Sequence, residues 1–345
     1  MIFKRFFSYI LNFLREDYKI IAFLLIFYLV ITFPLPYYVF TSGGITDLSN
    51  RFEVENGYVQ KGSYNLSYVN QLNGNVLTYL ISCIMPGMER VEVGNYQINE
   101  DESIEELAIR DKLMLSMANQ NASMIAYTKA GKNPIQKNLK LYVMAFDSEF
   151  ENRDEIKIGD ILVKIGDTKI EKVEDLEDAV RVLPVDTYVK ATFVRNDSEY
   201  TTNIKLKQED NRKILGLYFY TYYDLELDPK ITFKFSSSES GSSAGLMTTL
   251  AIYDTLIEED LTKGYKIAGT GTIASDGTIG EIGGVSYKLS GAVKGDADIF
   301  LVPSGENYEE CIKLKKERGY DIEIVEIKTF DDAIEYLENL KNKKE

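Results

Sequence analysis

Residues 233–250 read FKFSSSESGSSAGLMTTL, and this stretch decides how the C-terminal part of the chain folds. Its apolar start predicts a β-strand, and its end predicts a helix because Leu246 and Leu250 fall on one helical face. Between them lies a loop of serines and glycines. A serine at the first turn of a helix is exposed, close to free backbone N–H groups and at the positive end of the helix dipole. Such a loop can turn the chain, hold a phosphate or present a nucleophile.

Composition removes several function classes. The chain has 345 residues, which is enough for two or three domains, and a net charge of −15, which disfavours nucleic acid as a partner. It contains no histidine, so Ser-His-Asp and Cys-His catalysis are excluded together with the commonest zinc ligand. Cys83 and Cys311 are far apart and predict structural thiols. With no GxxxxGK[ST] phosphate loop either, we expect neither a metal nor a cofactor.

Residues 20–40 carry no charge and are long enough to cross a bilayer core of about 30 Å as a helix. We expect a transmembrane helix here, its outer part ended or kinked by Pro34 and Pro36. Basic residues precede the apolar run and acidic ones follow it, so the N-terminus, residues 1–19, is expected in the cytoplasm. The alternative is a cleaved signal peptide. In either case the bulk of the chain lies outside the cell, and the lipid bilayer is a predicted partner.

The remainder predicts an α+β multidomain protein. Residues 41–137 read as a small extracytoplasmic α+β module, 138–208 as a β domain, and 209–345 as an α/β domain that ends in a helix with Thr329 as its N-cap. The β domain follows the order IKIGD, ILVKIGDTKI and VEDLEDAV, which resembles a PDZ domain. This resemblance implies a peptide-binding groove between the second strand and the last helix. No GLGF-type carboxylate loop is visible near residues 142–147, so recognition of internal segments or pure scaffolding remains open.

A nucleophilic serine needs a base, and without histidine the candidates are lysine and the carboxylates. Gly283 and Gly284 turn the chain into a helix that we expect to begin near Val285, with Lys288 in its first turn. There the helix dipole opposes the ammonium charge. Burial acts in the same direction and would lower the pKa toward the range of about 7–8 that suits a general base.

Three blocks now become recognisable: GSSAGLMTTLAIYDTL, DLTKGYKIAGTGTIASDGTIGEIGGVSYK and FLVPSGEN. Together they resemble the proteolytic domain of Lon-type serine peptidases, with a ribosomal protein S5 domain 2-like fold and a Ser-Lys dyad. The order of span, PDZ-like domain and Lon-like domain resembles the membrane-anchored branch that lacks an ATPase module. The resemblance implies Ser243 as nucleophile, Lys288 as base and Thr270 as the residue that helps orient the lysine.

Two residues of the serine loop depart from the family pattern. The family usually has Gly-Pro-Ser-Ala-Gly, whereas Ser242 replaces the proline here and Ser240 precedes Gly241. We expect the oxyanion of an acyl-transfer intermediate to be held by backbone N–H groups of Gly241, Ser242 and Ser243.

Each site residue also has a plain structural interpretation. Ser243 can be an ordinary helix cap, Lys288 a solvated helix lysine and Thr270 a strand hydroxyl. Two other functions stay open: a non-catalytic exported PDZ scaffold with an inactive Lon-like domain, and a small-molecule kinase of the GHMP kind, whose phosphate loop resembles SGSSAGL. Glu239 next to the loop argues against phosphate.

The sequence therefore predicts an ATP-independent serine endopeptidase that is anchored in the cell membrane. It would cleave peptides or protein segments outside the cell, with the PDZ-like domain presenting substrate or gating access. The identity of the substrate and a homo-oligomeric state are left open by the sequence.

Overall fold

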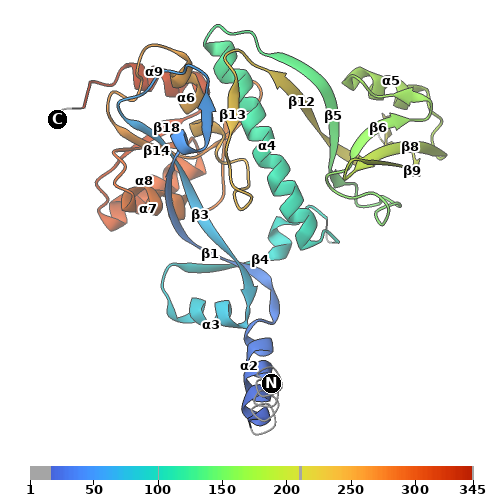
Figure 1. The fold of residues 1–345 in the computed structure, drawn as a ribbon, viewed down its shortest axis with the longest axis horizontal. Coiled ribbons are helices and arrows are strands. Elements are labelled where there is room, and N and C mark those ends of the chain that lie inside the picture. The colour runs from blue at the N-terminus through green and yellow to red at the C-terminus, as the bar shows by residue number, and fades with distance from the viewer. Residues whose placement is uncertain (1–16, 100, 210–211, 344–345) are drawn as a thin grey trace, which may run out of the picture. The chain divides into compact units, whose positions relative to one another are not determined.

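The computed structural model describes residues 17–99, 101–209 and 212–343 (Figure 1). Contacts divide the chain into two units. The first contains the described residues up to Ser42 together with Asn70–Tyr96, and the second contains Gly43–Val69 and the chain from Gln97 onward. Strands β1 (Pro34–Asp47) and β3 (Ser63–Asn75) pass through both units.

The first unit combines short helices with an antiparallel strand pair. Helix α2 spans Tyr18–Ile31, α3 spans Val76–Ile84 and the 3-10 helix η2 spans Val93–Tyr96. Strand β4 (Met88–Glu92) pairs antiparallel with β1 from Tyr37↔Glu92 to Thr41↔Met88. Asn75 starts α3 through a capping box with Thr78, which satisfies N–H groups at the helix N-terminus.

The helix predicted over residues 20–40 is wrong in its outer half. Helix α2 ends at Ile31, and the chain is extended in β1 from Pro34. Pro34 and Pro36 cannot donate backbone hydrogen bonds and disfavour helical geometry in the residue before them, so the helix stops where they begin. Among the described residues no helix is both long and apolar enough to cross a membrane. The predicted cytoplasmic segment, residues 1–19, lies mostly outside the described residues.

A parallel sheet forms the centre of the second unit. Strands β3, β14 (Lys266–Gly269), β17 (Ile299–Pro303) and β18 (Glu323–Ile327) lie side by side in the order β18-β17-β14-β3 and all run parallel. Helix α7 (Val285–Lys294) connects β14 to β17, and α8 (Glu306–Arg318) connects β17 to β18. Parallel neighbours need such crossover helices.

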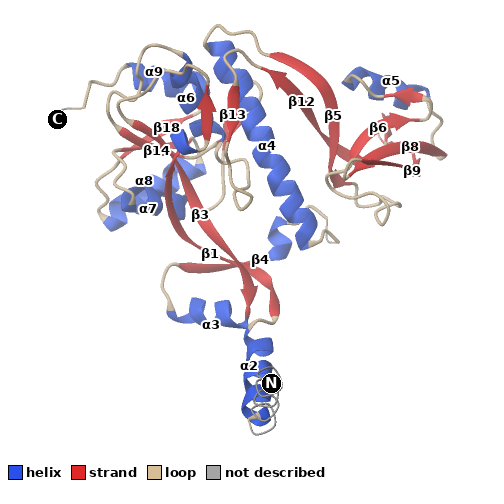
Figure 2. Ribbon diagram, viewed as in Figure 1, coloured by secondary structure: helices blue, strands red, loops and turns tan. Residues whose placement is uncertain are grey.

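Side chains of this sheet alternate between two apolar layers. Ile299 and Leu301 belong to one core cluster, whereas Phe300 and Val302 belong to another, as the twofold period of a strand requires. The second cluster is completed by α7 and α8. The first is completed by α4 (Ile104–Lys129), α6 (Gly245–Leu256) and α9 (Phe330–Glu338), so helices cover both faces of the sheet (Figure 2). Thr329 caps α9 as predicted.

A second sheet, in the order β12-β5-β6-β8-β9, follows α4 in the chain. Its elements are β5 (Ile135–Phe146), β6 (Ile161–Ile165), β7 (Thr168–Lys169, paired with β6), α5 (Val173–Val182), β8 (Tyr188–Arg195), β9 (Ser198–Lys205) and β12 (Leu217–Glu226). Strand β6 pairs with β5 on one side and with β8 on the other. A peptide therefore cannot add at this second strand as the PDZ resemblance implied, because its hydrogen-bonding edges are already used.

Short elements complete the fold. They are η1 (Leu48–Asn50), β2 (Phe52–Val54) paired with β13 (Ile231–Phe233), β10 (Lys207–Glu209) paired with β11 (Arg212–Ile214), and β15 (Thr272–Ile273) paired with β16 (Ile279–Gly280).

The segmentation expected from the sequence differs from these units. Residues 41–137 were expected to be a separate module, but β3 pairs in parallel with β14 from Lys266↔Ser63 to Gly269↔Leu66. Helix α4 packs in the same core cluster as α6. The segment before the PDZ-like sheet and the segment after it thus build one core. Sequence pattern could not show this because strand pairing across some 200 residues leaves no local signal.

Candidate active site

Ser243 lies at the end of the serine loop, directly before helix α6. Ala244 is the N-cap and Gly245 the first helical residue, so Ser243 precedes the helix rather than occupying its first turn. Its side chain is half-buried, and its hydroxyl makes no hydrogen bond to any described residue. Its backbone carbonyl is held twice, by the Gly271 N–H at 3.0 Å and by the Thr270 hydroxyl at 3.2 Å. The candidate nucleophile is therefore fixed through its main chain while its hydroxyl stays unengaged.

Lys288 is on helix α7 and is 4% exposed. Its backbone N–H donates to Gly284 O at 3.2 Å, which places it at the end of the first helical turn. Burial lowers the pKa of its amine from the usual 10.5 to about 7. Within the described part of the chain the amine has no carboxylate partner, so a large fraction of this lysine is neutral near pH 7.

Thr270 connects the Ser243 main chain to the Lys288 amine. It follows directly after β14, is fully buried, and its Oγ1 lies 3.0 Å from Lys288 Nζ. The same hydroxyl donates to the Ser243 carbonyl, so it must accept its second hydrogen bond from the lysine amine. One hydroxyl thus ties the amine on α7 to the main chain of the serine loop.

Two glycines make this arrangement possible. A Cβ on Gly245 would lie 2.7 Å from the Ile273 backbone nitrogen, so only glycine lets α6 start this close to β15. Gly284 adopts φ +67° as the N-cap of α7, a left-handed conformation that other residues rarely take. The turn that it makes orients the helix that carries Lys288.

The predicted oxyanion donors are not equivalent. The Gly241 N–H donates to the Asp111 carbonyl oxygen at 2.9 Å, so this donor is already occupied. The N–H groups of Ser242 and Ser243 make no hydrogen bond to described residues. They therefore remain the available donors next to the Ser243 hydroxyl.

Several residues that hold the site were not found by sequence reasoning. Asp111 on α4 anchors the serine loop, and the Asn121 amide donates to Ile273 O at 3.0 Å. Arg51 pairs with Glu239 at 2.7 Å, and the Ser67 hydroxyl donates to Lys288 O at 3.1 Å. All four come from segments before the PDZ-like sheet. Only tertiary contacts reveal them, because none sits in a recognisable motif.

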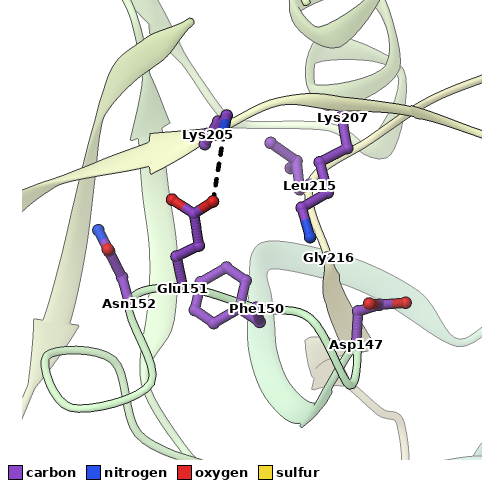
Figure 3. Close-up of a pocket in the computed structure, with 8 residues that line it drawn as sticks. All are labelled: Asp147, Phe150, Glu151, Asn152, Lys205, Lys207, Leu215 and Gly216. Atoms are coloured by element: carbon purple, nitrogen blue, oxygen red, sulfur yellow. Dashed lines mark hydrogen bonds and ion pairs between the residues drawn. The ribbon is translucent and has the colours of Figure 1, made fainter. Parts of the chain in front are cut away.

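A small hollow in the PDZ-like domain and the arrangement of possible metal ligands were the other candidate sites. A hollow in the PDZ-like domain, lined by Phe150, Lys207 and Gly216 among others, holds only about 10 Å³, room for roughly one water molecule (Figure 3). Its Lys205 is paired with Glu151 at 3.2 Å. No group of three or more His, Cys, Asp or Glu side chains among the described residues is arranged to hold a metal ion.

The C-terminal part of the chain is similar in sequence to known proteins. Residues 236–339 match the family model of the Lon protease (S16) C-terminal proteolytic domain. Ser243, Thr270 and Lys288 all lie within that match. Over 102 residues the chain is 34% identical to the Lon protease of Campylobacter jejuni, a segment that is 29% of this chain and 12% of that protein. The match supports a serine peptidase as the enzyme class, while the chain spans only a small part of that relative.

Two solved structures are PDZ-like neighbours. The PDZ domain of an SdrC-like protein from Listeria monocytogenes covers 23% of this chain and 85% of its own length, at 20% identity and a TM-score of 0.22. The second domain of a Listeria protein covers 27% of this chain and 89% of its own length, at 17% identity and a TM-score of 0.20.

Replacing Lys288 by Met should stabilise the fold. The folded-state pKa of about 7 lies below the unfolded value, so protonating this amine costs the native state stability at and below pH 7. That cost fades as pH rises from 7 toward 10.5. We expect Lys288→Met to raise the free energy of unfolding by about 3 kcal/mol at pH 7, with a smaller gain at pH 10.

Urea unfolding of both proteins at the two pH values measures this difference. An exposed lysine on the same helix, Lys294→Met, serves as the control and should change stability little at either pH. If the free energy of unfolding of Lys288→Met at pH 7 did not exceed that of the parent, burial of the Lys288 amine would not destabilise the native state, contrary to this prediction.

Proposed function

We propose that the chain is an ATP-independent serine endopeptidase with a Ser243–Lys288 dyad. The observation that carries the proposal is the buried Lys288 amine, whose pKa is lowered to about 7 and which bonds to Thr270 Oγ1 at 3.0 Å. A structural lysine gains nothing from this position, because burial without a carboxylate only costs stability. A general base needs such a position.

The chemistry follows from the hydrogen bonds. A neutral amine has two N–H bonds and one lone pair. Thr270 accepts one N–H, which restricts the direction of the lone pair. The Ser243 hydroxyl, unengaged before substrate binds, gives its proton to this lone pair as its oxygen attacks the scissile carbonyl. The resulting ammonium later returns the proton to the leaving amine, and the Ser242 and Ser243 N–H groups stabilise the oxyanion.

The PDZ-like domain is proposed to present substrate to this site or to restrict access to it. Chain connectivity supports this role. Helix α4 leads into the PDZ-like sheet through β5, and β12 leads back to β13 and the serine loop. Both connections of the PDZ-like sheet therefore lead to segments that hold the serine loop or continue into it.

We further propose that the first unit anchors the protein to the outer face of the cell membrane. The support is the apolar surface of α2, where side chains from Ile20 to Val30 are mostly more than half exposed. Exposed apolar patches of this kind mark membrane or protein contacts.

Peptidase activity should depend on Ser243 and on pH. We expect Ser243→Ala to lower kcat/KM at least about 1,000-fold without unfolding the protein, because it removes the attacking oxygen. For the parent chain, kcat/KM should rise as pH increases through about 7, since only the neutral Lys288 amine accepts a proton.

Cleavage of a fluorogenic casein-derived peptide library between pH 5 and 9 provides the measurement. Ser240→Ala, which alters another serine of the same loop, is the matched control and should retain activity. Equal cleavage by Ser243→Ala and the parent would refute the assignment.

Membrane topology can be read from Cys83. This thiol is exposed in the first unit, whereas Cys311 is buried, so a membrane-impermeant maleimide should label Cys83 alone. We expect labelling on intact cells, in the membrane fraction, and its loss in Cys83→Ser. Labelling that appears only after lysis would place the first unit inside the cell and contradict the proposal.

A further inference from the structure

A groove lies between helix α4 and the strands β12 and β13 of the second unit. It has a volume of about 450 Å³, within the range of sites that bind small ligands and peptide segments. From α4 it is lined by Leu115, Asn119 and Ser123, whose spacing places them on one face of the helix. From the strands it is lined by Tyr222 and Phe233, among others. Its walls are therefore partly apolar and partly polar.

An unpaired amide sits in this groove. The Asn119 Oδ1 atom is buried and has no hydrogen-bond partner, and the structure shows none for the Asn119 amide nitrogen among the described residues. The adjacent Gln120 is engaged, since its Oε1 accepts from the Tyr223 N–H at 2.7 Å. Burying a polar atom without a partner destabilises the fold. A carboxamide offers one acceptor and two donors, which complement the C=O and N–H of a peptide group.

Strand β13 adds a free hydrogen-bonding edge. Its antiparallel partner is β2, and Lys230 O accepts from Glu55 N at 2.9 Å while Lys234 N donates to Arg51 O at 2.7 Å. Because facing pairs alternate in an antiparallel ladder, the N–H and C=O of Phe233 point away from β2. No other strand in the described part of the chain pairs with β13. An extended chain can pair with such an edge.

The charge of the groove is positive. Lys112 and Lys230 line it, both are exposed, and neither forms an ion pair with a described residue. None of the described residues that line the groove is a carboxylate, although the whole chain carries a net charge of −15. The groove thus complements an acidic ligand in a protein whose surface otherwise repels one.

The groove is connected to the candidate active site through the chain itself. Asp111, the residue before Lys112, holds the Gly241 N–H at 2.9 Å. Strand β13 runs directly into the serine loop that ends at Ser243. Both walls of the groove therefore belong to elements that position the nucleophile.

We propose that this groove binds an extended acidic segment of the polypeptide substrate, away from the scissile bond. The Asn119 amide and the β13 edge pair with its backbone, and Lys112 and Lys230 pair with its carboxylates. The inference rests on the proposed peptidase function for the identity of the ligand as substrate, but binding itself requires no catalysis.

Peptide binding to the inert full-length Ser243→Ala chain tests the groove. The probe is a fluorescein-labelled peptide of alternating Thr and Val that contains three Glu, and the comparison peptide has Gln in place of each Glu. Fluorescence anisotropy gives Kd. We expect the Glu peptide to bind more tightly, and the double substitution Lys112→Glu and Lys230→Glu to weaken its binding at least about tenfold. Asn119→Leu should weaken both peptides alike, because it removes a contact to the backbone.

The double substitution Lys132→Glu and Lys313→Glu is the matched control, since it makes the same charge change at two exposed positions outside the groove. It should leave Kd unchanged. Absence of peptide binding, or binding that the groove variants do not alter, would overturn the proposal. So would concentration-dependent self-association that the groove variants abolish, because a second copy of the chain would then be the occupant. Failure of the parent chain to cleave peptides would contradict the peptidase function and leave the binding result standing.

Discussion

The candidate active site depends on one costly constraint: a single hydroxyl among the described residues is the partner of a buried lysine amine. Removing an ammonium group from water without a carboxylate disfavours the charged form, and the pKa of Lys288 falls to about 7 as a result. The parallel sheet and its crossover helix α7 place this amine beside Thr270 at the end of β14. Thr270 in turn holds the main chain that presents Ser243.

The fold supports this constraint from segments distant in sequence. Strand β3 lies beside β14, and Ser67 on that strand holds the Lys288 carbonyl. Helix α4 fixes the serine loop through Asp111 and the β15 region through Asn121. The PDZ-like sheet interrupts this core in sequence, between α4 and β13. Helix α4 and strand β13 therefore border the PDZ-like sheet in sequence and also hold or lead into the loop that carries Ser243.

The sequence predicted those features of the fold and the candidate site that leave a local pattern or motif. Glycines and the absence of histidine led to Lys288, and the resemblance to Lon-type peptidases implied Ser243 and Thr270. The structure brings Lys288 and Thr270 into contact. The sequence did not predict that residues 63–69 share the sheet with β14, or that α2 stops at Ile31, before the prolines that were expected to end or kink it. The first depends on long-range pairing. The second reflects how two prolines and a following strand outweigh a continuous apolar run. Nor did it predict that both edges of β6 are occupied, which removes the strand-addition site that the PDZ resemblance implied.

The protonation of Lys288 can be observed directly by NMR on protein labelled with ¹³C at lysine Cε, titrated from pH 5 to 11 and compared with Lys288→Met. We expect one resonance to titrate near pH 7 and to be missing from the variant. If the resonance that is missing from the variant did not titrate near pH 7, the amine would be charged at neutral pH. It could not then act as the base for Ser243.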